Sequence, residues 1–168
     1  MVKGFTLPEL MASLAILSII TALSAPHLSN IIERNKVEAD ILSIKSIIQS
    51  ARNKAITSKN HITICGRYIE NECSRDWSDL KVINPVKEEV IFEKSFSSEF
   101  SSVIWSAFQN KRGLTIAPTG YTDHQNGTLY LCYRGQKKLH RAVIVSKSGR
   151  VTIERNSSKL QRRCSKHT

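Results

Sequence analysis

The hydrophobic pattern in the first third of the chain predicts one long helix with two unlike halves. Residues 10–32 contain no Asp, Glu, Lys or Arg, and His27 is the one polar ring in this apolar run. At about 1.5 Å rise per residue, a helix over this run spans roughly 34 Å, which is enough to cross a bilayer. After Arg34 the apolar positions recur at steps of four and three, as in an amphipathic helix. These positions are Val37, Ile41, Ile44, Ile48, Ala51 and Ala55.

We therefore expect a helix over residues 5 to about 57, bent near Pro26. From residue 61 the pattern changes to short β-rich runs separated by turn residues. The expected strands cover residues 61–66, 80–83, 90–92, 102–108, 114–117, 128–133, 141–146 and 150–153. Asn126-Gly127 predicts a hairpin before residues 128–133, and Ser148-Gly149 predicts the last turn. The predicted fold class is α+β, with an antiparallel sheet covering the apolar stripe of the helix.

The residues before the apolar run have a specific order. A short basic leader ends at Gly4, Phe5 follows, and Glu9 is the carboxylate near the start of the run. A secretory signal is cleaved after its apolar core, and no A-x-A-like site closes this run before Pro26. The arrangement resembles the type IV prepilin leader, in which Gly is at the cut, an aromatic residue follows, and Glu is fifth in the mature chain.

This resemblance implies that prepilin peptidase cleaves between Gly4 and Phe5, that Phe5 is N-methylated, and that the apolar core stays on the mature protein. Pro26 matches the helix-kinking proline common in pilins. Pro8 departs from the Ile of many pilins, but a proline in the first helical turn costs little because its missing N–H has no helical partner. The alternative is a signal-anchor helix with an accidental Glu.

Glu9 needs a favourable partner, because a carboxylate facing lipid is costly and usually marks function. The family resemblance implies that Glu9 attracts the N-terminal amine of a neighbouring subunit during filament assembly. The alternative is a first-turn acid that the helix dipole favours. Both roles can hold together.

Four cysteines lie in the part of the chain expected outside the cytoplasm, where disulfides form. They permit three pairings, of which we favour Cys65–Cys73, closing a short loop, and Cys132–Cys164, tying the C-terminal tail to a strand. A zinc site is the competing interpretation. The chain has no C-x-x-C pair and its histidines are scattered, so we expect neither a metal nor another cofactor.

Positive charge is concentrated near the C-terminus. The chain has a net charge of +11, and residues 134–168 contain eleven Lys and Arg against a single acid, Glu154. Such a basic segment attracts polyanions, which are nucleic acid, anionic lipid or an acidic partner. The alternative is a solvated face that keeps the protein soluble.

The β-rich region resembles the GspH/FimT group of minor pilins and pseudopilins in three stretches. The first is Cys65, Cys73 and Trp77; the second is residues 114–120 followed by 127–132; the third is residues 142–151. Leu80 departs from the pattern, because a Gly is expected three residues after Trp77. This departure affects only the expected shape of the loop at Trp77. The resemblance implies a type IV pilin-like fold, in which a long N-terminal helix packs on an antiparallel β-sheet domain.

Members of this group that are linked to natural transformation bind DNA through a Gly-Arg-x-Arg stretch near the C-terminus. Gly149 and Arg150 match it, whereas Thr152 replaces the second arginine. Nearby cations can contact phosphates without reading base sequence. The only aromatic residues close to the tail are Tyr130 and Tyr133, so a single-strand site is not indicated. The candidate DNA-binding residues are Lys147, Arg150, Arg155, Lys159, Arg162 and Arg163. The alternative for Gly149-Arg150 is a hairpin turn with an exposed Arg.

We expect a cleaved leader over residues 1–4, a transmembrane half over residues 5–32, and a soluble domain over residues 33–168. The expected protein is a minor type IV pilin. It would cross the bacterial inner membrane once, with its domain in the periplasm, and would be extracellular when assembled in a pilus. It would bind double-stranded DNA non-specifically for uptake and contact other pilin subunits. The alternative is a minor pseudopilin at the tip of a type II secretion pseudopilus. No enzyme is expected, because the chain has no G-x-S-x-G elbow, paired-carboxylate site or metal signature.

Overall fold

The computed structural model describes residues 4, 6–70, 72–96 and 99–166, without the side chains of residues 25–27. The long helix, α1, covers Leu7–Ser58, close to the predicted residues 5 to about 57. The chain divides into two units, Met1–Glu38 and Ala39–Thr168, which are described separately. The bend predicted at Pro26 involves a side chain outside the described set and stays a prediction.

The first unit exposes the apolar side chains of α1. Its large apolar residues from Leu7 to Ile32 are 46–73 % exposed. The hydroxyls of Ser13, Thr21 and Ser24 each donate to a backbone carbonyl one turn earlier, so these polar groups are satisfied within the helix. By length and composition, α1 is a helix that can cross a membrane.

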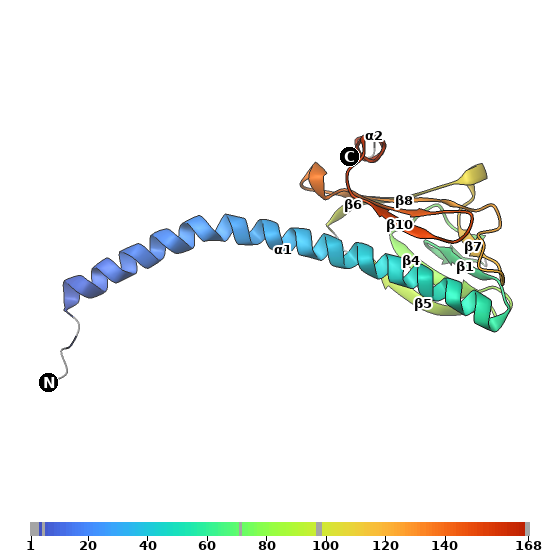
Figure 1. The fold of residues 1–168 in the computed structure, drawn as a ribbon, viewed down its shortest axis with the longest axis horizontal. Helices are drawn as coiled ribbons and strands as arrows, with labels where there is room; N and C mark the ends of the chain where they lie inside the picture. The colour runs from blue at the N-terminus through green and yellow to red at the C-terminus, as the bar shows by residue number, and fades with distance from the viewer. Residues whose placement is uncertain (1–3, 5, 71, 97–98, 167–168) are drawn as a thin grey trace. The chain divides into compact units, whose positions relative to one another are not determined.

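The second unit contains the C-terminal part of α1 and, over the described residues, two four-stranded antiparallel sheets (Figure 1). The first sheet has the order β5-β4-β1-β7 and the second has the order β10-β9-β8-β6. A two-stranded ribbon of β2 (Tyr68–Ile69) and β3 (Glu72–Cys73) accompanies them. The longer strands are β1 Ile62–Cys65, β4 Asp79–Asn84, β5 Glu89–Ser95, β6 Phe100–Ala107, β7 Leu114–Ile116, β8 Gly127–Tyr133, β9 Arg141–Val145 and β10 Val151–Glu154. All expected strands are therefore confirmed.

The amphipathic part of α1 contributes one buried stripe to the core of the second unit. Its spacing of three and four residues places the stripe on one helix face. The residues of this stripe are Ile41, Ile44, Ile48, Ala51 and Ala55, each at most 3 % exposed. The strands supply the other large buried side chains, which include Ile62, Ile64, Leu80, Ile83, Leu114, Ile116, Leu129, Leu131 and Val143. An ion pair of 3.1 Å between Lys94 Nζ on β5 and Asp40 Oδ1 on α1 also joins a strand to the helix. The predicted covering of the helix by a sheet is confirmed.

The hairpin predicted at Asn126-Gly127 is wrong. β7 pairs with β1, whereas β8 pairs with β6 and β9, so the chain crosses from one sheet to the other between β7 and β8. Gly127 has a different role, because a Cβ there would lie 2.7 Å from the Ser106 carbonyl oxygen and 2.8 Å from the Trp105 ring. A glycine in a strand can mark the close approach of another segment as well as a turn.

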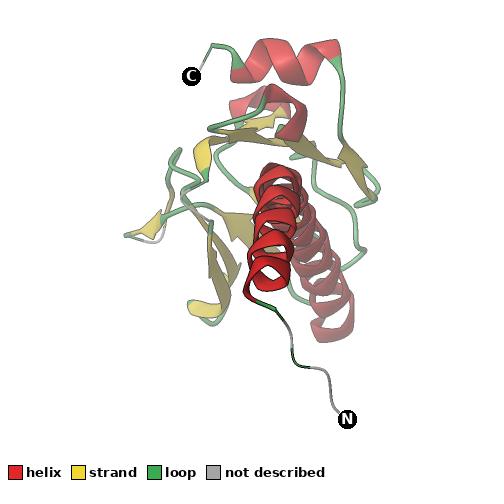
Figure 2. Cartoon of the chain, turned by 90° about the vertical axis from the view of Figure 1, so that its left-hand side faces the viewer, coloured by secondary structure: helices red, strands yellow, loops and turns green. Residues whose placement is uncertain are grey.

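A short helix near the C-terminus, α2 (Ser158–Cys164), was not predicted from the sequence. The Ser157 hydroxyl caps it by accepting the Leu160 N–H at 3.1 Å. Leu160 and Cys164 are fully buried and pack with Tyr130 and Ala142 of the second sheet. Figure 2 shows α2 on the outer side of that sheet, so the sheet is covered there by the helix.

Candidate functional site

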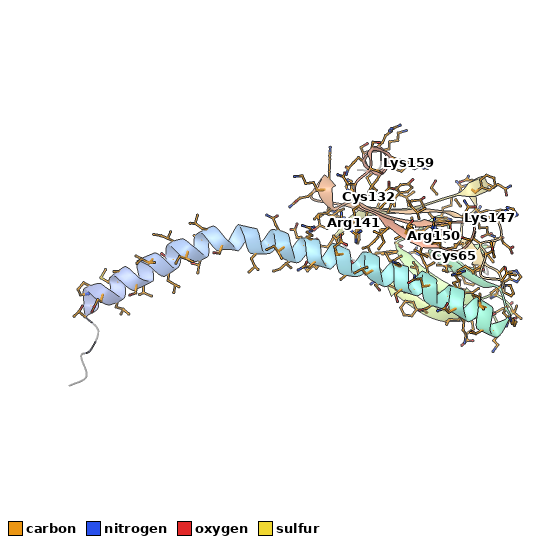
Figure 3. All side chains as sticks on the ribbon, viewed as in Figure 1. Cys65, Cys132, Arg141, Lys147, Arg150 and Lys159 are labelled. Carbon is orange, nitrogen blue, oxygen red and sulfur yellow. A yellow bond between two sulfur atoms is a disulfide. The ribbon has the colours of Figure 1, made fainter. Side chains whose placement is uncertain are left out.

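Five of the six candidate DNA-binding residues fall into two groups on the second sheet, and Arg155 lies apart from both. The hairpin group is Lys147 and Arg150, at the turn between β9 and β10. The α2 group is Lys159, Arg162 and Arg163. Figure 3 shows Lys159 on α2, away from Lys147 and Arg150 near the turn. Because β10 has four residues, roughly 13 Å of strand separates the hairpin group from Arg155, which follows β10.

Tight packing holds the turn of the hairpin group. Gly149 has a φ of +75°, and a Cβ there would lie 2.3 Å from the Gly120 carbonyl oxygen. Arg52 Nε donates to the same Gly120 oxygen at 3.0 Å, and the Thr122 N–H donates to the Lys147 carbonyl oxygen at 3.0 Å. The backbone conformation and the close packing at this position therefore require a glycine at Gly149. Arg150 is the residue of the pair whose side chain is exposed to solvent.

The α2 group combines exposed cations with one that is held in place. The Arg163 guanidinium lies 5.8 Å from the centroid of the Tyr130 ring, and its Nη2 donates to Ser106 Oγ at 3.0 Å. Lys159 and Arg162 are exposed. No acidic residue occurs in Ser158–Cys164. The helix therefore presents positive charge from a surface that packing and hydrogen bonds keep ordered.

Two disulfides join Cys65 to Cys73 and Cys132 to Cys164, the two pairs that the sequence analysis favoured. Their Cα–Cα distances are 5.6 and 5.3 Å, in the range usual for disulfides. The first closes the loop that contains β2 and β3, and the second ties α2 to β8. Both therefore occupy the thiolates that a zinc site would need.

His140 is a buried residue beneath the basic surface, and it is 3 % exposed. Its Nδ1 accepts the Tyr133 N–H at 3.0 Å. Burial lowers the pKa of His140 below its ordinary value, and the neighbouring cations Lys137 and Arg141 lower it further. The ring is therefore neutral at physiological pH and contributes no charge to the surface.

The processing residues lie at the start of the described chain. Gly4 is exposed, and Phe5 lies outside the described residues. Glu9 Oε2 accepts the N–H of Thr6 at 3.1 Å and its hydroxyl at 2.9 Å. This contact caps the first turn of α1. Cleavage after Gly4, methylation of Phe5 and the role of Glu9 toward a neighbouring subunit stay predictions.

Sequence reasoning missed the aromatic residues and cations that the fold brings beside α2. Tyr130 and Tyr133, the aromatic residues that the sequence analysis noted close to the tail, are only 2 % and 4 % exposed. Trp105, at the end of β6, instead lines a cavity together with Arg163, which follows it by more than fifty residues in the sequence. No local pattern could have placed these two residues around one cavity, because Trp105 lies on β6, Arg163 lies on α2, and β8 pairs with β6 and is bonded to α2 through Cys132–Cys164.

Comparisons with known proteins agree with this architecture. Residues 1–25 match the prokaryotic N-terminal methylation motif, and residues 41–149, more than half of the chain, match the type II transport protein GspH. The α2 group lies beyond the matched residues. No curated protein matches the sequence.

Two solved structures share the fold, both crystal forms of the type IV minor pilin FimU of Pseudomonas aeruginosa. One is 18 % identical with a TM-score of 0.56, covering 73 % of this chain and 90 % of FimU. The other is 17 % identical with a TM-score of 0.51, covering 71 % and 90 %. With the apolar helix, the methylation motif and the sheet domain in place, the chain belongs to the GspH/FimT family of type IV minor pilins and pseudopilins.

Proposed function

We propose that this membrane-anchored pilin is a minor subunit of a type IV pilus and binds double-stranded DNA non-specifically for uptake in natural transformation. The observation that supports this most directly is α2. It places Lys159, Arg162 and Arg163 on one short helix without an acid, and Leu160 together with the Cys132–Cys164 disulfide holds that helix on the sheet. Ordered cations suit the regularly spaced phosphates of a duplex.

The expected binding mode is contact with the phosphate backbone. Each phosphate that a Lys or Arg neutralises releases condensed counterions, so affinity falls as salt rises. Arg163 is oriented by Tyr130 and Ser106, which lowers the entropy lost when it contacts a phosphate. The hairpin group supplies a second contact. Backbone contacts of this kind carry no base-sequence information.

The proposed topology follows from the leader and the apolar run. Prepilin peptidase removes residues 1–4, residues 5–32 cross the inner membrane, and residues 33–168 lie in the periplasm until assembly carries the subunit out of the cell. Glu9 then meets the amine of a neighbouring pilin. The exposed apolar side chains of the first unit and the cation-free, acid-free run of residues 10–32 support this arrangement.

A minor pseudopilin of a type II secretion system is the second candidate, and the GspH match over residues 41–149 favours it. In that case the basic surface would contact an acidic neighbouring subunit at the tip of the pseudopilus. Because both candidates use the same leader and anchor, only the ligand of the basic surface separates them.

The test is DNA binding by the full chain, cleaved after Gly4 and kept in non-ionic detergent. Duplex affinity is measured across a salt series for the wild type, for an α2 variant and for a hairpin variant. The α2 variant changes Lys159, Arg162 and Arg163 to Gln, and the hairpin variant changes Lys147 and Arg150 to Gln. The matched control removes three exposed cations elsewhere, Lys54, Lys59 and Lys87, in the same way.

We expect a log–log salt slope of about −3 to −6 for the wild type, and a slope smaller in magnitude by about 2 to 3 in the α2 variant. The control should keep the wild-type slope. If the wild type binds no duplex at moderate salt, or if the control loses as much slope as the α2 variant, specific DNA capture by α2 is ruled out and the pseudopilin function becomes the better proposal.

A further inference from the structure

A cavity of about 500 Å³ lies at the free edge of β6, the outermost strand of the second sheet. Its cations come from three separate parts of the chain. Arg75 precedes β4, Lys111 and Arg112 follow the short 3-10 helix Phe108–Asn110, and Arg163 lies on α2. No carboxylate is among its lining residues, all of which the structure describes. The cleft is thus a place where an anion gains several favourable contacts.

Three of the four cations around this cleft are available to a ligand, and the fourth, Arg163, is oriented by Ser106 and Tyr130. Arg75 and Lys111 are exposed and make no ion pair among the described residues. Arg112 Nη1 lies 3.5 Å from Glu72, in a pair whose side chains are 54 % and 77 % exposed. Solvent screens such an exposed pair, so it competes weakly with a bound anion.

Aromatic rings lie beside these cations. Trp77 and Trp105 stack with their ring centroids 5.2 Å apart, and Trp77 Nε1 donates to the Arg112 carbonyl oxygen at 3.2 Å. Trp77 is buried, whereas Trp105 is only partly buried. Phe108, three residues after Trp105, is 56 % exposed. A fixed indole pair therefore lines the cleft, and an exposed phenyl ring outside that lining lies between Ser106 and Asn110 in the sequence, which both line it.

Two features of the backbone and side chains near the cleft are unusual. Gln109 and Asn110 both have positive φ, 55° and 56°, a conformation that is unfavourable for residues other than glycine and that clusters at binding sites. Trp105 Nε1 and Ser102 Oγ on β6 are buried without a hydrogen-bond partner in the described part of the chain. Most buried polar atoms in proteins are paired, so both features set this edge of the sheet apart from the core.

We infer that this cleft, together with Phe108 beside it, binds a short single-stranded segment of DNA. The bases stack on Phe108 and on the accessible part of Trp105, and the phosphates contact Arg75, Lys111 and Arg163. An aromatic side chain can stack on bases only where they are unpaired, and such stacking tolerates any base. A cavity of this size accommodates a ligand of about one nucleotide, whereas a duplex is too wide to enter it.

This inference rests on the proposed function, because both need DNA as the ligand, but apart from Arg163 it uses different residues. Arg163 is shared between the α2 group and the cleft, so a duplex on α2 and a frayed or unpaired strand in the cleft can belong to one molecule. The free edge of β6 by itself would accept any extended peptide. A peptide, however, does not require the four cations and the aromatic rings, so these favour the nucleic acid.

The experiment compares a fluorescein-labelled oligothymidylate with a duplex, using the full chain in non-ionic detergent. The variant is Phe108→Ala with Lys111→Gln, and both side chains are exposed, so the fold should persist. The matched control is Phe92→Ala with Lys87→Gln, an exposed phenyl ring and an exposed cation at the β4–β5 hairpin. The only two tryptophans of the chain are Trp77 and Trp105, so intrinsic fluorescence reports on the cleft directly.

We expect oligothymidylate to change the tryptophan emission of the wild type, and the variant to bind it about tenfold more weakly while duplex affinity stays within about twofold. The control should match the wild type. Unchanged oligothymidylate binding and emission in a variant that still binds duplex would overturn the inference and leave the proposed function standing. Recovery of the variant in sheared filaments is measured as well. If the variant is lost from filaments but binds oligothymidylate as the wild type does, the inference is also overturned, and this edge of the sheet contacts a neighbouring subunit instead. If neither form of DNA binds the wild type, the proposed function and the inference both fall.

Discussion

At the scale of single residues, Gly149 and Arg150 are neighbours with different roles. The family motif pairs them, but Gly149 is buried against Gly120 and Arg52, whereas the Arg150 side chain is exposed. Within the described part of the chain, Arg150 is held through its backbone, since its N–H donates to Ser146 Oγ at 3.1 Å. The glycine therefore forms the turn that presents the arginine, and substitutions at the two positions should have separable effects.

Gly149→Ala should destabilise the protein by about 2–4 kcal/mol, because alanine is strained at a φ of +75° and its Cβ would meet the Gly120 oxygen. The free energy of unfolding from urea denaturation measures this. Arg150→Gln should change it by less than about 0.5 kcal/mol. Gly135→Ala is the control, since Gly135 is exposed with no positive φ. Equal stability of the Gly149→Ala variant and the wild type would contradict the packing role.

His140 makes stability depend on pH. The pKa of the buried ring is lowered, chiefly by burial, so the unfolded chain binds its proton more readily than the folded one. The stability that the neutral ring allows is fully present above the unfolded pKa of about 6.5. It is lost as pH falls through the folded pKa. His140→Asn keeps an acceptor for the Tyr133 N–H but does not titrate. Its free energy of unfolding should therefore fall less than that of the wild type between about pH 7.5 and 5.5. Equal falls would contradict this.

At the scale of elements, α2 is a short helix that depends on its attachments. A helix of seven residues is not stable alone in water, because nucleating its first turn is unfavourable. Its attachments are the Ser157 cap, the buried Leu160 and the bond from Cys164 to Cys132. The order of the α2 group therefore depends on the oxidising environment that forms this disulfide.

Changing Cys132 and Cys164 to Ser together should destabilise the protein by about 3–4 kcal/mol, from the loop entropy of the bond, whose sequence separation is 32. Duplex affinity should fall as well, because the α2 cations become less ordered. Denaturation and duplex binding are the two measurements. Changing Cys65 and Cys73 to Ser, with a separation of 8, is the control and should cost less stability. Full duplex affinity after loss of Cys132–Cys164 would show that an ordered α2 is unnecessary.

At the scale of the whole molecule, the chain combines an exposed apolar helix with a compact sheet domain. Within the first unit, Glu9 already has hydrogen bonds from Thr6. These bonds stabilise the first turn of α1, so an effect of Glu9 on assembly must be separated from an effect on the helix start. Thr6→Ala weakens this contact without touching the carboxylate, since it removes the hydroxyl hydrogen bond and keeps the one from the backbone N–H.

Glu9→Ala should leave cleavage after Gly4 intact and strongly reduce recovery of the subunit in sheared filaments, because an unpaired amine in the apolar layer is unfavourable. Immunoblots of the filament fraction and of whole membranes measure both. Thr6→Ala should assemble normally. If Thr6→Ala reproduces the defect, the role of Glu9 lies in the helix start, and normal recovery of Glu9→Ala would exclude any role in assembly.

Local patterns predicted much of this protein because they reflect local physics. The apolar run and the three- and four-residue stripe determined α1, and β-rich runs determined the strands. The short helix α2 escaped prediction, because its stability comes from Leu160, Cys164 and the sheet beneath them rather than from a periodic pattern. The hairpin at Asn126-Gly127 was predicted wrongly, because a glycine is also needed where two strands approach closely, and Gly127 lies at such a place.

The sequence by itself determined the apolar anchor, the positive C-terminal segment and the spacing of the cysteines, since each is a property of neighbouring residues. Only the tertiary structure decided which strands share a sheet, and with that which charges share a surface. It separates Arg150 from the α2 group and brings Arg75, Trp105, Lys111 and Arg163 around one cleft. Contacts between such distant segments arise from strand pairing and the burial of a common core. The local hydrophobic periodicity of the sequence does not predict them.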